Sequence, residues 1–305
     1  MNRIANPQRL RSCLKLFHSP LAAHKHLAFI GRAGRHGMAP VKLHFRKTGP
    51  QTFPRLGDWK GVWDLVLRDP DRADLHVEGD LFQLSIDGTR CSLRIGSGDV
   101  KAFTEIHLRD VYGLRELPNE LGHVIDLGAH IGMFSMAVAA RAKQVVALEP
   151  VPSNFDCARK NLETTRLGDR VRLLQMALGP RTGERIELQS AGAHSSSSRG
   201  TTDRVEVECI SLEDLFEKEA IDRCALLKCD IEGAEYAAFE AAPLSLLQRI
   251  DALRMEIHVE PPATTTAQFH ALRAKLESAG LRVVHEPEHS ASGALRTTLM
   301  LRGDR

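Results

Sequence analysis

The stretch VIDLGAHIG at residues 124–132 decides how this 305-residue chain folds. Its first residues suit a buried strand, and Gly128 and Gly132 then mark a tight turn before a helix expected at residues 133–141. A glycine-rich turn at the end of a parallel strand lets a ligand approach the backbone closely. The spacing is G-x-x-x-G, so the G-x-G-x-x-G fingerprint is absent, which argues against a nicotinamide or flavin dinucleotide.

Beyond that turn, short apolar runs alternate with helical patterns. Phe155, Ala158 and Leu162 repeat at helical spacing, Ser211 is expected to cap a short helix, and a further helical pattern ends at Gly280. Strands that alternate with helices predict a doubly wound α/β fold with a mostly parallel sheet. The expected strands lie at residues 123–128, 144–149, 171–178, 204–210, 224–230 and 251–260, with residues 281–286 and 295–301 as an antiparallel pair at one edge.

The region before this pattern contains a predicted β-hairpin. LFQLSI at residues 81–86 and RCSLRI at residues 90–95 flank an Asp-Gly-Thr turn, and such a turn between alternating runs is a good short-range hairpin signal. We therefore divide the chain into a basic N-terminal extension with the hairpin, at residues 1–98, and an α/β domain at residues 99–305.

The net charge of +2 (41 basic minus 39 acidic residues) hides an asymmetry. Residues 1–60 contain twelve Lys or Arg and one acid, Asp58, which gives +11, whereas the remaining 245 residues give −9 (29 basic minus 38 acidic). Such an arm either contacts an anionic surface or is a solvated extension. It lacks the aromatic interleaving that stacks on bases, so no nucleic-acid partner is expected.

Composition narrows the class of protein further. Hydrophobic residues at 43% and charged residues at 26% exclude disorder over the whole length. No run approaches the ~18 apolar residues of a membrane-spanning helix. The six Cys form no CxxC pair, which is typical of reduced thiols in a cytoplasmic protein. The Arg-rich, acid-poor start also resembles a mitochondrial transit peptide, although Ser is sparse there, and a secretory signal is disfavoured.

An acid at the end of the next strand suggests the ligand. Glu149 lies seventeen residues past Gly132, where a carboxylate can accept hydrogen bonds from both hydroxyls of a ribose. Together, Asp126, Gly128, Gly132 and Glu149 make an adenosine-type site that does not require a pyrophosphate. Asp126 would repel a diphosphate but tolerate a cation, so S-adenosylmethionine, which has an adenosine, a sulfonium and an ammonium, is the predicted cofactor.

Three nearby positions are weaker candidates for contact with the cofactor. Asn154 either supports the Glu149 site or only helps to start a helix. Met176 and Ala177, at the end of the third expected strand, either lie near the adenine edge or fill the core.

With these residues in place, the chain resembles the FkbM family of S-adenosylmethionine-dependent methyltransferases over roughly residues 100–301. The motifs that carry the resemblance are DVKAFTEIHLRDVYGL (99–114), VIDLGAHIG (124–132), LEPVPSNF (148–155), ISLEDLF (210–216), LLKCDIEGAE (226–235) and MEIH (255–258).

The resemblance implies a seven-strand, Rossmann-like class I methyltransferase fold and transfer of a methyl group from sulfonium sulfur to an oxygen. Family substrates are hydroxyls of secondary metabolites, sugars or lipid-linked glycans. The resemblance places Ala129 and His130 at the cofactor turn, with His130 where the family usually has Asn. His130 can still donate a hydrogen bond, but its charge depends on pH, and a protonated ring would sit badly beside a sulfonium.

The catalytic candidates follow two neighbouring strands. Asp230 ends one strand, Glu235 follows in the next helical turn, and His258 ends the adjacent strand. Ligands bind outside the carboxyl ends of the strands in this fold, so Asp230, Glu235 and His258 are expected to converge on one pocket. His258 or Asp230 is the predicted base for the acceptor hydroxyl, and Glu235 is expected to position the acceptor.

Structural roles compete at these positions. Glu235 suits a helix N-terminus, His258 a strand-end hydrogen bond, and Asp230 a contact that orients the cofactor. Glu232 can shape the turn, and Glu256 can pair with Lys228, which shares a strand face with Asp230. No ligand spacing demands a metal, so none is predicted, although the carboxylates and His258 leave a divalent cation open.

Two functions follow from these residues. The first is an O-methyltransferase that acts on a hydroxyl of a small molecule, sugar or glycan. The second is a non-catalytic S-adenosylmethionine-binding protein that recruits an anionic partner through residues 1–60. The retained Glu149 and the downstream carboxylates favour the enzyme.

Overall fold

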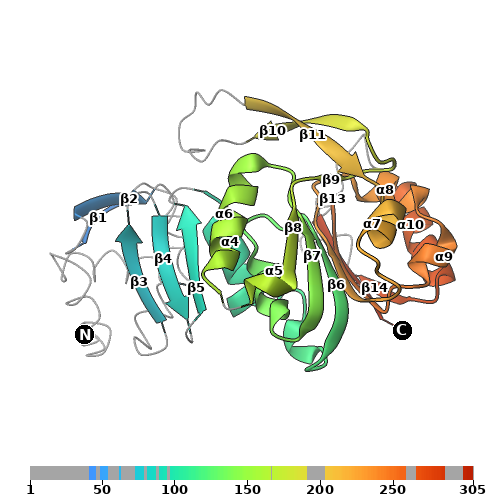
Figure 1. The fold of residues 1–305 in the computed structure, drawn as a ribbon, viewed down its shortest axis with the longest axis horizontal. Helices are drawn as coiled ribbons and strands as arrows, with labels where there is room; N and C mark the ends of the chain where they lie inside the picture. The colour runs from blue at the N-terminus through green and yellow to red at the C-terminus, as the bar shows by residue number, and fades with distance from the viewer. Residues whose placement is uncertain are drawn as a thin grey trace, which may run out of the picture. The chain divides into compact units, whose positions relative to one another are not determined.

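The computed structural model describes residues 41–45, 49–53, 62, 73–78, 81–86, 89–94, 97–165, 167–190, 203–258, 266–285 and 298–304 (Figure 1). The chain divides into two compact units. The N-terminal unit comprises Met1–Val111, Glu163–Thr165 and Ala191–Asp203, and the C-terminal unit comprises Tyr112–Leu162, Arg166–Ser190 and Arg204–Arg305. Most of the basic arm and the expected polar loop at residues 191–200 lie outside the described residues.

The N-terminal unit is built from antiparallel strands. The predicted hairpin is confirmed, because β4 (Leu81–Ile86) pairs with β5 (Thr89–Arg94) in antiparallel register. Alternation buries Phe82 and Leu84 on one face of β4. The other elements among the described residues of this unit are β1 (Val41–Phe45), β2 (Gly49–Phe53), β3 (Ala73–Glu78), the short helix α4 (Asp99–Phe103) and the π-helical turn η3 (Thr104–Leu108).

The C-terminal unit contains a seven-stranded sheet, as predicted. Its strand order is β14-β15-β13-β12-β6-β7-β8, in which β15 is antiparallel to its two neighbours and the other pairs of described strands are parallel. The bounds are β6 (Leu121–Leu127), β7 (Ala142–Leu148), β8 (Val171–Leu174), β12 (Cys224–Cys229), β13 (Ala252–His258), β14 (Arg282–His285) and β15 (Thr298–Asp304).

The order of the strands places a ligand site. From β6 the chain adds β7 and β8 on one side, and it then returns to add β12 and β13 on the other side of β6. The boundary between β6 and β12 is therefore a topological switch point, and ligands bind at the carboxyl ends of the strands at such a point in open α/β sheets.

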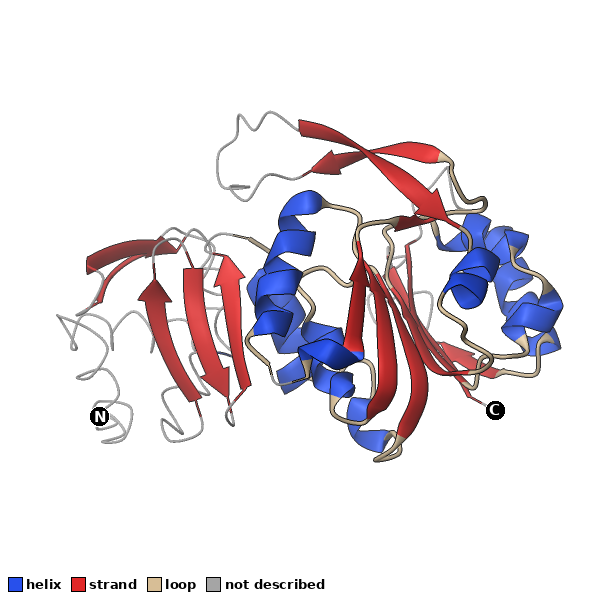
Figure 2. Ribbon diagram, viewed as in Figure 1, coloured by secondary structure: helices blue, strands red, loops and turns tan. Residues whose placement is uncertain are grey.

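Helices cover both faces of this sheet (Figure 2). Ser211 caps its helix as predicted, because its hydroxyl accepts a hydrogen bond from the backbone N–H of Asp214 at 3.1 Å. Gly280, with φ of 92°, follows the last helix, also as predicted. On one face lie α5 (Met133–Ala139) and α6 (Pro152–Glu163), and on the other α7 (Leu212–Lys218), α8 (Glu235–Ala241), α9 (Leu244–Leu247) and α10 (Thr266–Ser278).

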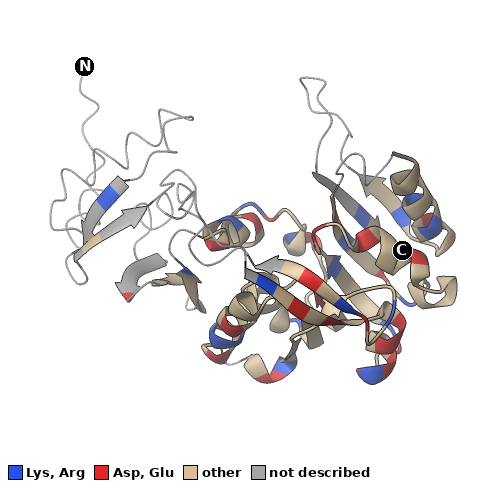
Figure 3. Ribbon diagram, turned by 90° about the horizontal axis from the view of Figure 1, so that it is seen from above, with Lys and Arg blue, Asp and Glu red and all other residues tan. Residues whose placement is uncertain are grey.

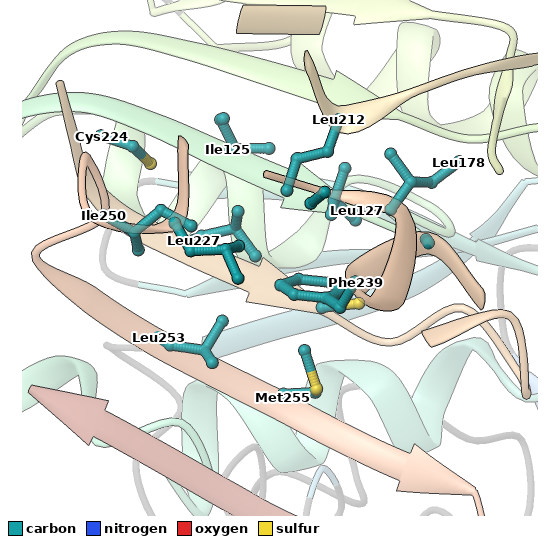
Figure 4. Close-up of a cluster of buried hydrophobic side chains, with 14 of the residues drawn as sticks. Ile125, Leu127, Leu178, Leu212, Cys224, Leu227, Phe239, Ile250, Leu253 and Met255 are labelled. Carbon is teal, nitrogen blue, oxygen red and sulfur yellow. The ribbon is translucent and has the colours of Figure 1, made fainter. Parts of the chain in front are cut away.

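Strand alternation gives the two faces of the sheet different chemistry. The face toward α7–α10 carries an apolar core that includes Leu127, Leu227 and Phe239 (Figure 4). On the opposite face, Asp126 of β6 is in register with Lys228 of β12. Successive strand residues point to opposite faces, so β6 and β12 contribute apolar side chains to the core on one face and charged side chains on the other.

The strand predicted at residues 171–178 is wrong in its extent. β8 ends at Leu174, and Ala177 with Leu178 forms β9, which belongs to a separate three-stranded sheet, β10-β11-β9. Ala177 packs with Val207 and Cys209, so a second small core takes over the apolar run. The other strands of this sheet are β10 (Arg185–Ser190) and β11 (Asp203–Ile210).

The surface of the C-terminal unit mixes both signs of charge (Figure 3). Cross-strand pairs Arg185–Glu206 and Arg204–Glu187 join the exposed faces of β10 and β11, with N–O distances of 3.3 and 3.0 Å. Exposed pairs of this kind contribute about 0–1 kcal/mol each. No helix among the described residues is long and apolar enough to cross a membrane.

Candidate active site

The glycine turn after β6 lies directly against the end of β12. Gly128 has φ of 77°, and a Cβ built on it would lie 1.8 Å from the backbone oxygen of Asp230. The backbone N–H of Asp230 also donates to the carbonyl of Leu127 at 3.0 Å. We expected Gly128 to admit a ligand, but the protein's own backbone already occupies the space of a side chain. Gly128 therefore joins the glycine turn to the strand end that carries Asp230.

A buried ion pair supports this turn. Lys228 Nζ lies 3.3 Å from Asp126 Oδ1, and it also donates to the carbonyls of Leu127 at 3.2 Å and Gly128 at 2.6 Å. Ser135 of α5 donates to Asp126 Oδ2 at 2.7 Å. Burial lowers the pKa of Lys228, but the Asp126 and Asp230 charges outweigh it, so the pKa is raised and the amine stays protonated. Asp126 thus acts on the turn through Lys228.

The ammonium group of Lys228 therefore contacts Asp126 and the glycine turn. The pairing with Glu256 that the sequence left open is replaced by the contact with Asp126.

Glu149 lies at the end of β7 and is tied to the same turn. Its Oε2 accepts from the backbone N–H of His130 at 2.7 Å, and its Oε1 accepts from Val151 N at 2.9 Å and Asn154 Nδ2 at 3.3 Å. Burial raises the pKa of Glu149, although the three hydrogen bonds and Lys228 act in the opposite direction. Residues that are seventeen or more positions apart in the sequence thus form one structural unit, in agreement with the predicted grouping.

The turn itself has left-handed backbone at three positions. His130 has φ of 53°, and Gly132 has φ of 81°. The N–H groups of Gly128 and Ala129 both donate to the carbonyl of Leu148, at 3.0 and 2.8 Å. A left-handed His is tolerated better than a β-branched residue, so this strained position suits a short polar or ring side chain. These bonds fix the turn beside the end of β7.

The two candidates after β8 lie in apolar surroundings. Met176 is half-buried and packs against the main core. Ala177 is buried, and in β9 it pairs with Cys209 of β11. Their contact with an adenine stays a prediction.

The three catalytic candidates come together, as expected from the strand faces. His258 Nδ1 lies 3.0 Å from Glu235 Oε1, and His258 Nε2 lies 4.0 Å from Asp230 Oδ1. Nε2 also lies 3.3 Å from Oε2 of Glu232, whose side chain is 85% exposed. Glu235 is fully buried at the first residue of α8, and it also accepts from Ile231 N at 3.3 Å. Glu235 therefore contacts the cluster through His258.

The imidazole of His258 carries a proton at neutral pH in this arrangement. The hydrogen bond to Glu235 raises its pKa most, burial lowers it, and the charges of Glu232, Glu235 and Asp230 raise it further, to about 9. A group with this pKa is a poor proton acceptor near pH 7. Among the two predicted bases, Asp230 is the one available in the described arrangement.

Tyr112 and Glu256 are site residues that the sequence did not assign. The Tyr112 hydroxyl donates to Glu256 Oε1 at 2.9 Å and lies 3.5 Å from Asp230 Oδ2. Its ring packs edge-on against Phe134 with centroids 5.6 Å apart, next to the glycine turn. Burial and the two carboxylates raise the pKa of Tyr112, so the hydroxyl remains a donor. Its partners lie 118 and 144 positions away, and no local pattern signals such contacts.

The sheet and the site together define a class of protein. The chain has a mostly parallel, Rossmann-like seven-stranded sheet, with an acid, Glu149, after β7 and another, Asp230, after β12. The family model "Methyltransferase FkbM domain" matches residues 126–283, just over half of the chain. The chain therefore belongs to the FkbM methyltransferase family, which confirms the resemblance.

Solved structures show distant similarity. The FkbM methyltransferase from Methylobacillus flagellatus KT is 16% identical with a TM-score of 0.43, and the match covers 65% of this chain and 47% of that one. This chain thus spans about half the length of that protein. The S-adenosylmethionine-dependent methyltransferase from Agrobacterium tumefaciens is 12% identical with a TM-score of 0.42, over 75% and 71% of the two chains.

The METTL16 methyltransferase domain is 12% identical with a TM-score of 0.44, over 91% of both chains. No curated protein matches this chain.

Proposed function

We propose that this chain is an S-adenosylmethionine-dependent O-methyltransferase that acts on a hydroxyl of a small molecule, sugar or glycan. One observation carries the proposal. At the switch point of the sheet, the turn with Glu149 and the cluster of Asp230, Glu235 and His258 are joined through the contact between Gly128 and Asp230. This arrangement supports a nucleoside site and a proton-transfer site on neighbouring strand ends.

The residues beside the turn fit the predicted cofactor. Glu149 presents a fixed carboxylate, and a carboxylate has about four acceptor positions, of which three are used. The bond from Asn154 is the longest, at 3.3 Å, so a ribose hydroxyl can replace it. Gly128, Ala129, His130 and Gly132 supply the turn against which the nucleoside would lie. When bound, the cofactor supplies a methyl group on a positively charged sulfur.

The neighbouring cluster has the charge that such a cofactor needs. Asp230, Glu235 and Glu256 contribute three carboxylates, and His258 contributes one proton-bearing ring. The excess of negative charge favours a cation in the pocket and disfavours an acceptor that carries phosphate groups at the reacting end. This argument supports a neutral hydroxyl acceptor.

Asp230 is the proposed proton acceptor. It is partly exposed, and its carboxylate faces His258 on one side and Tyr112 on the other. The acceptor hydroxyl would donate to Asp230, and a base in this position contributes about 10²–10⁴-fold to the rate. Glu235 is a positioning residue because its contact with the pocket runs through His258.

Isothermal titration with S-adenosylmethionine tests the cofactor site. We expect saturable binding to the full chain, lost or strongly weakened in Glu149→Ala. Glu217→Gln, an exposed carboxylate on α7, is the matched control and should bind normally. Gly128→Val is a poor test, because its side chain would collide with the Asp230 backbone whether or not a ligand binds. Equal affinity in wild type and Glu149→Ala would contradict the proposed site.

Release of S-adenosylhomocysteine tests the enzyme. We expect turnover with a pool of hydroxyl-bearing metabolites and glycans, and a large loss in Asp230→Asn with cofactor affinity retained. Cofactor binding without any release in such a screen would instead favour a binding protein.

A further inference from the structure

We propose that Asn161 of α6 is a positioning residue for the cofactor, because it holds the glycine turn at residues 128–132 in the conformation that binds. The inference rests on the proposed function, since the nucleoside would lie against this turn. Asn161 is fully buried, and its Nδ2 donates to the carbonyl oxygen of Ile131 at 2.9 Å. Asn161 therefore acts on the cofactor site through the backbone of the turn.

The turn needs support from other elements because its backbone is strained. Gly128, His130 and Gly132 all have positive φ, and His130 has a side chain that disfavours this conformation. A non-glycine residue in the left-handed region persists only where the surrounding structure fixes it. Contacts that reach the turn from neighbouring strands and helices therefore decide which conformation the cofactor meets.

Two side chains hold neighbouring residues of the turn. The N–H of His130 donates to Glu149 Oε2 at 2.7 Å, and the carbonyl of the next residue, Ile131, accepts from Asn161 at 2.9 Å. Glu149 follows β7 and Asn161 belongs to α6, so the two hydrogen bonds fix the turn from different elements. Ile131 is itself fully buried, so its carbonyl could not turn toward water if the amide of Asn161 were removed.

Helix α6 joins this contact to the carboxylate that is proposed to bind the ribose. Near the start of the helix, Asn154 donates to Glu149 Oε1 at 3.3 Å. Further along, Ala158 lies against the turn, because a Cβ on Gly132 would be 3.5 Å from it. Asn161 follows Ala158 by three residues and therefore lies on the same face of the helix. One helix thus carries partners for both Glu149 and the turn.

Buried polar side chains are concentrated around this turn. In the described part of the C-terminal unit, most of them contact the turn or a residue that does, namely Asp126, Ser135, Glu149, Asn161 and Lys228, and the others are Glu235 and Arg254. Burying polar groups is costly unless they are paired, and a connected set of them favours a single conformation. A turn that is ordered before the cofactor arrives lowers the entropic cost of binding.

Calorimetric titration of the full chain with S-adenosylmethionine tests this role. Asn161→Leu keeps a side chain of similar size and removes the donor, so the affinity should fall about tenfold, which corresponds to the loss of one hydrogen bond. Leu276→Ala is the matched control, because it disturbs a fully buried position in α10, on the opposite face of the sheet. It should lose stability in denaturant unfolding and still bind with normal affinity.

Asn161→Asp adds a pH profile that a purely structural role would not produce, and it decides the question if Asn161→Leu does not fold. An ionised carboxylate cannot donate to the carbonyl of Ile131, whereas a protonated carboxyl can, and burial favours the protonated form. The ratio of the dissociation constants of variant and wild type should therefore fall toward one as the pH decreases from ~8 to ~6. The response of Glu149 is common to both proteins and cancels in this ratio.

The outcomes separate this role from the proposed function. Circular dichroism first checks that each variant is folded. Normal affinity in both Asn161 variants, an equal loss of affinity in Leu276→Ala, or a ratio that does not change with pH would overturn the positioning role and leave the cofactor site intact. No saturable binding to wild type would overturn the cofactor site and the positioning role together.

Discussion

The two halves of the site differ in how their charges are satisfied. In the proposed cofactor half, Asp126 is paired with Lys228, and Glu149 accepts one hydrogen bond from the turn after β6 and two from the segment that follows β7. In the acceptor half, the buried Glu235 has an oxygen without a partner, and three carboxylates share one imidazole. Asp126 in the first half likewise has one oxygen without a hydrogen-bond partner, but that oxygen lies 3.3 Å from Lys228. The halves therefore differ in net charge, and the excess of carboxylates in the second half favours a cationic ligand.

This contrast teaches that burial alone does not identify a functional carboxylate. Asp126 and Glu235 are both fully buried, each has one oxygen without a hydrogen-bond partner, and each contacts one cation, Lys228 or the His258 imidazole. The difference lies in the cation: Lys228 also donates to two turn carbonyls, whereas His258 is shared with two further carboxylates. Substitutions in the two halves should therefore differ in whether they cost folding stability or activity.

The largest effect on stability is expected from Lys228→Met. The substitution leaves Asp126 buried without its counter-charge and frees two turn carbonyls. Removing one partner of a buried pair costs about 3–5 kcal/mol. Denaturant unfolding measures the loss. The double variant Asp126→Asn with Lys228→Met should recover much of it, and an equally unstable double variant would show that the charge imbalance is not the cause.

A smaller effect on stability should distinguish two glycines of the same turn. Both Gly128 and Gly132 have positive φ, which costs a non-glycine residue about 1–2 kcal/mol. A Cβ on Gly132 would meet its nearest atom, in Ala158, at an ordinary 3.5 Å, whereas one on Gly128 would overlap the Asp230 carbonyl at 1.8 Å. Gly128→Ala should therefore lose clearly more free energy of unfolding than Gly132→Ala. Equal losses would mean that the Asp230 carbonyl moves aside easily.

The fold could be predicted from the sequence wherever the hydrophobic pattern had a single interpretation. Buried strands alternating with helices predicted the parallel sheet, and the shared faces of β12 and β13 predicted that Asp230 and His258 meet. The split between β8 and β9 was missed because the apolar run from residues 171–178 is continuous, and only the position of a second small core decides where the sheet ends.

The chemistry of the site was less accessible for a related reason. A glycine at position 128 shows that a side chain is excluded, but not that the Asp230 carbonyl excludes it. Tyr112 reaches Glu256 across 144 positions, and nothing near Tyr112 in the sequence announces that contact. Long-range polar contacts depend on the packed sheet, so local patterns do not encode them.

An intermediate effect is expected from Tyr112→Phe in the acceptor half. The substitution keeps the ring contact with Phe134 and removes the donor to Glu256. Hydrogen bonds to charged groups contribute about 1.5–3 kcal/mol, and Glu256 is partly exposed, so water should recover part of the loss and bring it toward the lower figure. Denaturant unfolding gives the stability, and steady-state kinetics should show a lower kcat with cofactor affinity retained. An unchanged kcat would remove Tyr112 from the acceptor half.

The smallest effect is a pH dependence of cofactor affinity set by Glu149. Ribose hydroxyls donate to the ionised carboxylate, so affinity should fall as Glu149 takes up a proton. Burial raises its pKa above the ordinary value of 4.5, so the fall on acidification should begin at a higher pH than for an exposed Glu. Calorimetric titration with S-adenosylmethionine across the acid-to-neutral range measures the curve.

Two variants determine whether Glu149 is the titrating group. Glu149→Gln cannot ionise, so its weaker affinity should be flat where that of wild type falls. Asn154→Ala removes a hydrogen bond that lowers the pKa of Glu149, so its curve should shift to higher pH. The backbone bonds from His130 and Val151 persist in both variants and hold the loop in place. If Glu149→Gln leaves the curve unchanged, another group titrates, and the pH dependence of cofactor affinity does not come from Glu149.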